Sequence, residues 1–488
     1  MQAGESAPPH PALDDRWVRA LARSLSAEVV ETHISWVLLA GGFAYKLKKP
    51  LALPFVDYSA LSARRHFCEE EVRLNQRLAP SLYLGVSRIT GSRDAPAMDG
   101  EGPVIDHAVR MRRFPAAALF SERLASGHLK PEHVDAIAER LAAFHRQAPV
   151  CSPGTAFATP AHRRSVALAA LRGARTAATP EQHALLASWI DAQADALAPL
   201  WQARREAGRI RECHGDLHLD NLVILDDGPA AFDGIEFDPA LRWIDVIDDI
   251  AFAVMDFCAR GHAGLAWRLL NAWLDHSGDH AALPALRFAA VYRALVRAQV
   301  AQLRGTAAAG QARRYLDTAV AWTQPRPLRL CITHGLPGSG KTRASQRLLE
   351  REGAIRLRSD VERKRLFGLA PLADSRAAGL DLYNAATTAR TYEHLFELAR
   401  GILRASYPVV IDAAFLRGDE RARARAAAQE AGVPFAILDC DAPVEVLRAR
   451  LLARRGDASE ADEAVLERLR QAAEPLTAEE RAHAFTGD

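Results

Sequence analysis

The segment from His334 to Glu350 contains residues that could hold a nucleotide phosphate. Its sequence, HGLPGSGKTRASQRLLE, fits the spacing G-x-x-x-x-G-K-T of a phosphate-binding loop. Glycines let backbone N–H groups turn toward a phosphate, and the N-terminus of a following helix adds a favourable dipole. The lysine would reach the β- and γ-phosphates, and the threonine hydroxyl would ligate Mg²⁺. The predicted nucleotide-binding residues are Gly335, Leu336, Pro337, Gly338, Ser339, Gly340, Lys341, Thr342 and Arg343.

A second group of chemically capable residues lies upstream, in the stretch HGDLHLDNLVILDDGPAAFDGIEFD of residues 214–238. Asp216 precedes Asn221 by a short loop, and Asp233 follows beyond a predicted hairpin. A kinase-type site needs one Asp to orient and deprotonate an acceptor hydroxyl, and an Asn and a second Asp to bind Mg²⁺. The order and spacing of these three residues are therefore typical of a kinase-type site.

The stretch HGDLHLDN resembles the H-G-D-x-H-x-x-N signature of the aminoglycoside phosphotransferase and choline kinase-like family. The resemblance covers about residues 30–320 and implies a two-lobed, protein kinase-like fold. It implies that Asp216 is the catalytic base and that Asn221 and Asp233 are metal ligands. It also implies that His214 and His218 are structural. Members of this family phosphorylate aminoglycosides, choline, homoserine or sugars, and residues 240–320 do not identify one acceptor.

The remaining kinase parts can be sought upstream of this stretch. Lys46, on the second strand of a predicted hairpin, is placed to pair with phosphates and with a helix carboxylate. Lys48 shares its face by the period of two, so it remains an alternative. Of three consecutive glutamates on the next predicted helix, Glu71 lies on the apolar face by helical spacing, and we take it as the partner of Lys46. A solvated acidic run is the competing interpretation.

Three further features follow from the kinase resemblance. The sequence MRRF, with Met111 and Arg113, is predicted to be the hinge whose backbone meets adenine. Asp249 is predicted to be structural and to anchor the catalytic loop. No G-x-G-x-x-G precedes Lys46, where EVVETHISW stands instead, and this departure leaves the rate of turnover open.

The segment LRSDVERKRLFG after the phosphate-binding loop carries a second resemblance. With the strand VVIDAAFLR, it is similar to the P-loop small-molecule kinases, the group that contains gluconate kinase, zeta toxin and the polynucleotide 5′-kinases. The resemblance implies that Asp360, in a D-x-x-R setting with Arg363, takes the proton of the acceptor hydroxyl. Asp412 ends a predicted strand, where it either holds the water shell of Mg²⁺ or supports the loop.

Residues 448–462, RARLLARRGDASEAD, resemble the lid of these kinases. In the family, lid arginines close over the transferring phosphoryl group, and Arg454 and Arg455 are the candidates here. A solvated basic helix face is the competing interpretation.

The chain of 488 residues is long enough for two or three domains. Two prolines in Thr323–Pro327 discourage helix continuation, so we expect a linker there. The predicted domains are residues 1–325, with a small lobe to about 113 and a helical lobe over 114–322, and residues 326–488. Buried strands alternate with helices in the second domain, which predicts an α/β fold with a parallel sheet. The first domain is predicted to be α+β.

Bulk composition narrows the function classes. Formal net charge is only +2, and no basic stretch is interleaved with aromatic residues, which argues against a nucleic-acid partner. Six cysteines without a C-x-x-C pair predict reduced thiols and no zinc site. No apolar run is long enough to span a bilayer, and the first residues do not resemble a signal peptide, so a cytoplasmic protein is expected.

Together the patterns predict an ATP-dependent and Mg²⁺-dependent phosphotransferase that acts on hydroxyl groups of small molecules such as sugars, amino sugars or aminoglycosides. Two alternatives remain open. One half could catalyse while the other senses nucleotide, or the C-terminal half could be a polynucleotide 5′-kinase. The sequence decides neither the acceptors nor the oligomeric state.

Overall fold

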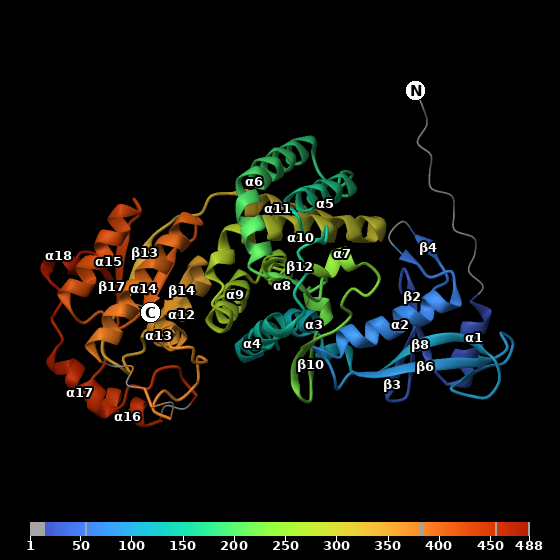
Figure 1. Cartoon of the computed structure of the whole chain (residues 1–488), viewed down its shortest axis with the longest axis horizontal. Coiled ribbons are helices and arrows are strands. Elements are labelled where there is room, and N and C mark those ends of the chain that lie inside the picture. Colours follow the sequence, from blue (N-terminus) through green and yellow to red (C-terminus); the bar gives the residue numbers. More distant parts are fainter. Residues whose placement is uncertain are drawn as a thin grey trace. The chain divides into compact units, whose positions relative to one another are not determined.

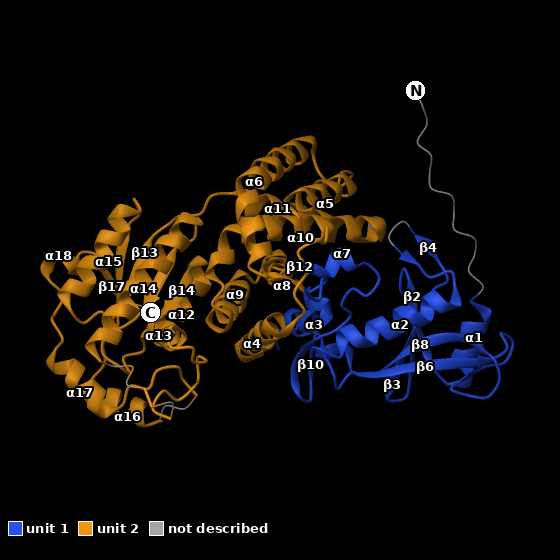
Figure 2. Cartoon of the chain, viewed as in Figure 1, with its two compact units in different colours: residues 1–129, 212–244 blue, residues 130–211, 245–488 orange. Residues whose placement is uncertain are grey.

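The computed structural model describes residues 15–53, 56–377, 379–380, 382, 384–453 and 456–486, and Figure 1 shows their helices and strands. The chain forms two compact units, residues 1–129 with 212–244 and residues 130–211 with 245–488 (Figure 2). The predicted fold class is confirmed: an antiparallel sheet and a helical kinase-like region precede a five-stranded parallel sheet. The predicted domain boundary at residue 325 stays a prediction, because the compact units describe packing and divide the chain elsewhere.

The first unit is built on an antiparallel sheet in the order β1-β2-β3-β8-β6-β7. Alternate residues of β3 face opposite sides of this sheet. Leu47 belongs to a core that includes Trp17 of α1, and Ala44 belongs to a core that includes Cys68 of α2. Lys46 shares the side of Ala44, so it is directed toward α2. The elements are α1 (Arg16–Ser24), β1 (Glu28–Glu31), β2 (Ser35–Ala40), β3 (Phe43–Lys48), β4 (Ala52–Leu53), β5 (Val56–Asp57), α2 (Leu61–Asn75), β6 (Tyr83–Gly91), β7 (Pro96–Met98) and β8 (Val104–Arg112).

A loop and a hairpin complete the first unit. Leu119 forms an isolated bridge with Val223 of β10, which attaches the hairpin to the segment after the sheet. The loop between β9 and β10 carries the H-G-D stretch. The elements here are α3 (Phe120–Ala125), β9 (Ile210–Glu212), β10 (Leu222–Leu225), β11 (Gly228–Ala231), α7 (Pro239–Arg242) and β12 (Trp243–Asp245).

The second unit begins with a group of helices around α8, whose residues are almost all buried. Within the described ranges, no helix is long and apolar enough to cross a membrane. Arg204 joins two segments that are distant in the sequence through buried ion pairs. Its Nε donates to Asp245 at 2.7 Å, and its Nη2 donates to Asp279 at 2.8 Å. The helices are α4 (Pro131–Gln147), α5 (Pro160–Gly173), α6 (Pro180–Glu206), α8 (Val246–Ala259), α9 (Ala263–Ser277), α10 (Leu283–Leu303) and α11 (Ala309–Thr323).

A parallel sheet in the order β14-β15-β13-β16-β17 forms the rest of the second unit. The carboxyl ends of β13, β14 and β15 meet at one edge of this sheet, which brings the loops after them together. The elements are β13 (Leu330–His334), α12 (Lys341–Glu352), β14 (Ile355–Arg358), α13 (Ser359–Leu366), α14 (Ala385–Arg404), β15 (Val409–Asp412), α15 (Gly418–Glu430), β16 (Phe435–Asp439), α16 (Val444–Ala453), α17 (Glu463–Gln471), α18 (Ala478–Arg481) and β17 (Ala484–Thr486).

The helices and the parallel sheet of the second unit are in contact around α9. The Trp267 ring lies 5.8 Å from that of Trp322 and 6.1 Å from that of Tyr407, measured between ring centroids. The Arg326 guanidinium lies 4.2 Å from the centroid of the Trp267 ring. The predicted linker at Thr323–Pro327 is therefore flanked by packed side chains, and one of its own residues takes part in this packing.

We predict that Arg204→Met lowers the free energy of unfolding of the second unit by about 3–5 kcal/mol, because two buried carboxylates would lose their guanidinium partner. Arg204 is 4% exposed, and Asp245 and Asp279 are 0% and 3% exposed. The measurement is urea-induced unfolding. The control is Arg164→Met, which breaks exposed pairs with Asp191 and Asp195 and should cost at most about 1 kcal/mol. Equal losses in the two variants would contradict the prediction.

Candidate functional site

The lysines of β3 meet a shared carboxylate on α2. Lys46 Nζ lies 2.9 Å from Glu71 Oε1, and it also pairs with Asp233. Lys48 pairs with Glu71 and with Glu236. Glu71, which is completely buried, therefore bridges both lysines, and the structure brings Asp233 to the predicted pair of Lys46 and Glu71. The roles of these residues in catalysis stay predictions.

Exposure distinguishes the two lysines. The Lys48 side chain is fully enclosed, and Tyr58 donates a 2.6 Å hydrogen bond to its partner Glu236. The Lys46 side chain is 13% exposed, and its partner Asp233 is 44% exposed. Lys46 thus lies at the accessible end of the charge cluster, where a phosphate could reach it. Lys48 is enclosed and anchors β3 to Glu71 and Glu236.

Sequence reasoning did not find Tyr58 and Glu236. A possible signal was the carboxylate three residues after Asp233 in FDGIEFD, which repeats the acidic character of that loop.

Opposing effects set the ionisation of this cluster. Burial lowers the pKa of the Lys46 ammonium, but the Asp233 and Glu71 carboxylates outweigh burial and hold that pKa well above its usual range. Burial raises the pKa of Asp233, but the Lys46 ammonium outweighs it and holds that pKa below its usual range. Both groups are therefore charged near neutral pH, as a site for phosphate and a metal ion requires.

The loop before β10 orients Asp216. Asn221 Nδ2 donates to the Asp216 carbonyl oxygen at 2.9 Å and to its Oδ2 at 3.1 Å. His218 Nε2 lies 3.3 Å from the same Oδ2. Because the amide nitrogen of Asn221 faces Asp216, its amide oxygen is the atom available to a metal ion. His214 contacts the Phe232 carbonyl oxygen at 2.9 Å, which joins the two ends of the hairpin.

Asp233 is held in an uncommon backbone conformation, with a φ of 62°. Left-handed φ values cost free energy for residues other than glycine and occur at functional sites. The Asp233 N–H donates to the Tyr83 hydroxyl at 3.0 Å, and the Gly234 N–H donates to Asn75 Oδ1 at 2.8 Å. Tyr83 and Asn75, two positioning residues that the sequence did not reveal, thus fix the direction of the carboxylate.

The connection between β1 and β2 is a short turn where protein kinases have a glycine-rich loop. The Thr32 N–H donates to the Ser35 carbonyl oxygen at 2.9 Å, and Lys49 Nζ donates to the Thr32 carbonyl oxygen at 2.6 Å. This turn offers no glycine to lie over phosphates. At the predicted hinge, the Arg113 N–H donates to the Gly42 carbonyl oxygen at 2.9 Å. Met111 lies on β8, between β3 and β6, and is buried in the core that includes Ala44 and Cys68. Adenine contact by Met111 and Arg113 stays a prediction.

The phosphate-binding loop joins β13 to α12. Its three glycines, Gly335, Gly338 and Gly340, have φ values of 140°, 84° and 97°. These values lie in the region that favours glycine, so the chain can turn its N–H groups inward. Lys341 Nζ donates to the carbonyl oxygens of Gly335 and Leu336, each at 2.8 Å, and so lies across the loop. The structure places this loop at the carboxyl end of the sheet, where nucleotides bind in such folds.

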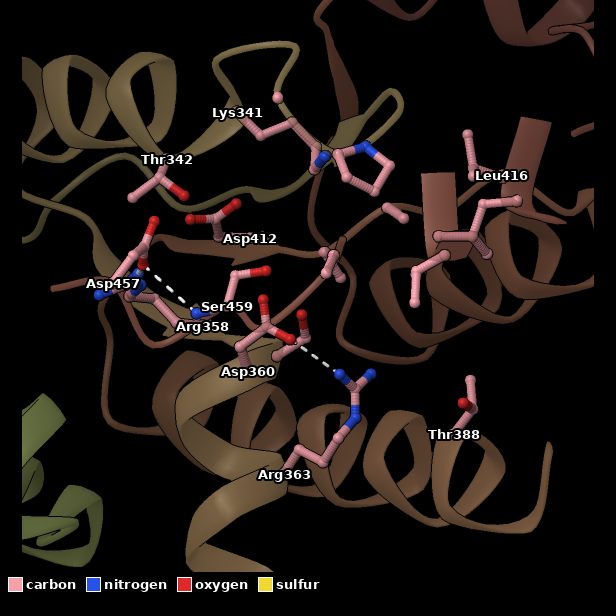
Figure 3. A pocket seen from close by; sticks show the side chains of 18 of the residues that line it. Lys341, Thr342, Arg358, Asp360, Arg363, Thr388, Asp412, Leu416, Asp457 and Ser459 are labelled. Atoms are coloured by element: carbon pink, nitrogen blue, oxygen red, sulfur yellow. Dashed lines mark hydrogen bonds and ion pairs between the residues drawn. The ribbon is translucent and has the colours of Figure 1, made fainter. Parts of the chain in front are cut away.

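Candidate metal ligands and a candidate base surround the loop. Thr342, Asp412, Asp360 and Lys341 line one cavity of about 520 Å³, and Figure 3 shows their side chains around it. Asp412, at the end of β15, accepts a 3.2 Å hydrogen bond from the Ser345 hydroxyl. The cavity also contains Pro337, Gly338, Gly340 and Arg343 from the predicted nucleotide-binding set.

Asp360 lies in the first turn of α13, directly after β14. Arg363 Nη1 donates to Asp360 Oδ1 at 2.8 Å, as the dashed line in Figure 3 shows. Beyond Asp360 the cavity continues toward other side chains that could hold an acceptor. They are Thr388, Tyr392, Leu416, Arg417, Glu420, Val465, Arg468 and Leu469.

The segment predicted as a lid contributes Arg450 to the site. Its Nη1 donates to the Gly338 carbonyl oxygen at 2.9 Å. Arg358 of β14 pairs with Asp457 at 2.7 Å, which ties the lid segment to the sheet. The predicted arginines Arg454 and Arg455 lie outside the described residues. Arg450 was missed because it lies earlier in the same basic run.

Comparison with known proteins agrees with this two-part arrangement. Residues 61–288 match the phosphotransferase enzyme family, and residues 330–476 match an AAA domain. Uncharacterized proteins of Mycobacterium bovis and Mycobacterium tuberculosis are 31% identical to this chain over 465 residues, which is 93% of this chain and 89% of theirs. The chain belongs to their family. The two matches show that this chain carries two kinase-like domains, an N-terminal phosphotransferase region and a C-terminal P-loop kinase region.

Solved structures give weaker likenesses to the same two regions. A gluconokinase from Sinorhizobium meliloti is 20% identical, covers 33% of this chain and 83% of its own, and has a TM-score of 0.23. A choline kinase from Cryptosporidium parvum is 9% identical, covers 61% of this chain and 88% of its own, and has a TM-score of 0.38. At such TM-scores, neither likeness bears on the substrates of the family member described here.

We predict that Gly335→Ala weakens nucleotide binding by the phosphate-binding loop. A Cβ at this position would lie 2.1 Å from the Cys440 carbonyl oxygen, so the loop backbone would have to move. Backbone strain of about 1–3 kcal/mol should weaken binding by tenfold or more. The measurement is the amount of ATP bound per chain at equilibrium. Gly401→Ala, where the added Cβ meets nothing within 4 Å, is the control, and equal binding by both variants would contradict the prediction.

Proposed function

We propose that the chain is an ATP-dependent phosphotransferase with two catalytic sites, each transferring the γ-phosphoryl group to a hydroxyl of a small molecule. One observation carries this proposal: each site combines a lysine, metal-binding side chains and a separate carboxylate for the acceptor. The sets are Lys46, Asn221 and Asp233 with Asp216, and Lys341, Thr342 and Asp412 with Asp360. Such a division of labour is what phosphoryl transfer by positioning and charge neutralisation requires.

In the N-terminal site, Asp216 accepts the proton of the acceptor hydroxyl. The acceptor oxygen forms a bond to the γ-phosphorus, the bond to the bridging oxygen of the β-phosphate breaks, and ADP leaves. Lys46, which Glu71 holds from behind at 2.9 Å, neutralises phosphate charge. The oxygens of Asn221 and Asp233 suit Mg²⁺, which when bound would neutralise phosphate charge.

In the C-terminal site, Asp360 takes the corresponding proton and Arg363 holds its carboxylate. Lys341 would exchange the carbonyl oxygens of Gly335 and Leu336 for phosphate oxygens. The Thr342 hydroxyl suits direct ligation of Mg²⁺, and Asp412 suits its water shell. Arg450 of the lid segment, which donates to the Gly338 carbonyl oxygen, supplies a further cation beside the loop.

The acceptors are proposed to be small and polar. The C-terminal cavity continues past Asp360 between α14, α15 and α17, where arginine, threonine, tyrosine and glutamate side chains line it together with apolar residues such as Leu416, Val465 and Leu469. Sugars and amino sugars present hydroxyl groups to such a lining, whereas a polynucleotide would need an open basic channel with aromatic faces. The small-molecule reading is therefore the better supported one for this site.

A second candidate function concerns the N-terminal site alone. The short turn between β1 and β2, closed by Thr32 and held by Lys49, provides no backbone cover for a γ-phosphate. This observation favours an N-terminal half that binds nucleotide and transfers phosphate slowly, as a sensor would. The Asp216 variant described next separates the two functions.

We predict that Asp216→Asn lowers N-terminal phosphotransfer by about 10²–10⁴-fold, because a positioned general base contributes that much. ATP affinity should stay within a few-fold, because the proposed metal ligands are other residues. The acceptor would be found by screening metabolite and aminoglycoside pools for an ATP-dependent gain of mass. Asp220→Asn, the same change on the same loop, is the control and should retain activity. Full activity of Asp216→Asn would refute its role as base.

We predict that Lys341→Ala lowers C-terminal phosphotransfer by about 10²–10³-fold, the usual cost of losing a transition-state charge contact. The fold should be retained, because the Lys341 ammonium lies over loop carbonyls and supports no core. The measurement is steady-state kinetics with thermal unfolding as the check on folding. Arg351→Ala removes an exposed cation from the end of the same helix and is the control. An unchanged kcat/KM in Lys341→Ala would contradict the assignment.

A further inference from the structure

Helix α9 completes the open edge of the parallel sheet. β14 is an edge strand, and such strands carry unpaired backbone groups. The Asn271 side chain pairs with it as a neighbouring strand would: Nδ2 donates to the Ala354 carbonyl oxygen at 3.0 Å, and Oδ1 accepts from the Arg356 N–H at 2.7 Å. Asn271 is 1% exposed. The buried Asn271 amide on α9 therefore fixes where β14 begins relative to the helix.

One helical turn further on, Asp275 reaches the side chain of the same strand residue. Arg356 Nη2 lies 3.4 Å from Asp275 Oδ2, and its Nη1 lies 3.4 Å from the Thr342 carbonyl oxygen. The Arg356 and Asp275 side chains are only 7% and 12% exposed. Burial lowers the pKa of the guanidinium and the Asp275 carboxylate opposes this. A carboxylate on α9 is thus linked through one buried cation to the first turn of α12.

The far end of this linkage is the proposed Mg²⁺ ligand. Thr342 offers its hydroxyl to the cavity, while its carbonyl oxygen accepts from Arg356. Residues two apart on a strand share a face, so Arg358 follows Arg356 on the side that meets Asp457 of the lid segment. Asp360, the proposed base, comes directly after. Displacement of β14 or Arg356 would therefore move the metal ligand and the base together.

We propose that Asn271 and Asp275 on α9 are positioning residues for phosphoryl transfer at the phosphate-binding loop, acting through β14 and Arg356. The inference rests on the proposed function of that site. Helix α9 lies within the region that matches the phosphotransferase enzyme family. Under this proposal it also positions residues of the P-loop kinase region. The C-terminal site is then complete only when the helical region is attached.

The test measures Mg²⁺-dependent nucleotide binding, because a displaced Thr342 should affect the metal-bound nucleotide selectively. All proteins carry Asp233→Asn, which suppresses metal binding at the N-terminal site. A fluorescent N-methylanthraniloyl ATP is titrated with Mg²⁺ and again with EDTA. We expect Asp275→Asn to weaken binding about tenfold with Mg²⁺, as loss of a supporting contact to a metal ligand does, and less than twofold with EDTA. Asp275→Glu should restore most of the affinity.

The matched control is Arg268→Gln on the same helix. Arg268 pairs with Asp135 at 2.7 Å and Glu350 at 3.0 Å across the same contact, without touching β14 or the phosphate-binding loop. The Arg268→Gln variant should leave nucleotide binding unchanged with Mg²⁺ and with EDTA, even if it loses as much thermal stability as Asp275→Asn. Should Asp275→Asn fail to fold, Arg356→Lys serves instead, because one ammonium cannot span both contacts, and it should show the same selective loss.

Two results would overturn the positioning role. They are equal weakening with Mg²⁺ and with EDTA, which indicates general disruption, or unchanged Mg²⁺-dependent binding in both Asp275→Asn and Arg356→Lys. A different result would overturn the proposed function itself. The parent protein would show no Mg²⁺-dependent nucleotide binding, or Lys341→Ala would fail to remove that binding. The two failures are therefore distinguishable in one set of titrations.

Discussion

The pairing of Asn271 with the backbone of β14 joins the helices of the second unit to its parallel sheet. The edge strand of a sheet has backbone N–H and C=O groups that no neighbouring strand pairs with, and these groups must be covered. Here the cover is a helix from another sequence region, and the Trp267 ring and Arg326 extend the contact beside it. The two kinase-like regions therefore share buried polar and aromatic contacts, and the segment between them is more than a tether.

The two candidate sites hold their lysines by different physical means. In the first unit, the ammonium of Lys46 is held by the buried carboxylate of Glu71, so the strand lysine depends on a helix. In the phosphate-binding loop, Lys341 lies on the backbone carbonyl oxygens of Gly335 and Leu336, so the loop backbone itself holds the cation. Charge clusters of the first kind need no glycine-rich loop to place the cation. This difference explains how the short turn between β1 and β2 can coexist with an ordered Lys46.

Much of this arrangement could be predicted from the sequence, because local spacing carries it. The period of two on β3 and the helical spacing of α2 predicted that Lys46 or Lys48 pairs with Glu71, and the structure contains these pairs. The strand–loop–helix pattern located the parallel sheet. The period of two could not distinguish Lys46 from Lys48, because their difference lies in the Asp233 and Glu236 side chains that arrive from a distant segment. Asn271 gave no signal, since a buried asparagine in a helix looks like any polar residue until the strand that it pairs with is known. The same holds for Tyr83, whose hydroxyl fixes the Asp233 backbone.

The central claim is that one chain holds two separate sites for Mg²⁺–ATP, and nucleotide stoichiometry tests it most directly without knowledge of either acceptor. The measurement is equilibrium dialysis of the full chain with a non-hydrolysable ATP analogue and Mg²⁺. The account predicts two nucleotides bound per chain. It also predicts that substituting Lys341 removes one of them, and that substituting both Lys341 and Asp233 removes both. A single bound nucleotide in the unaltered chain, or a stoichiometry that these substitutions leave unchanged, would contradict the account.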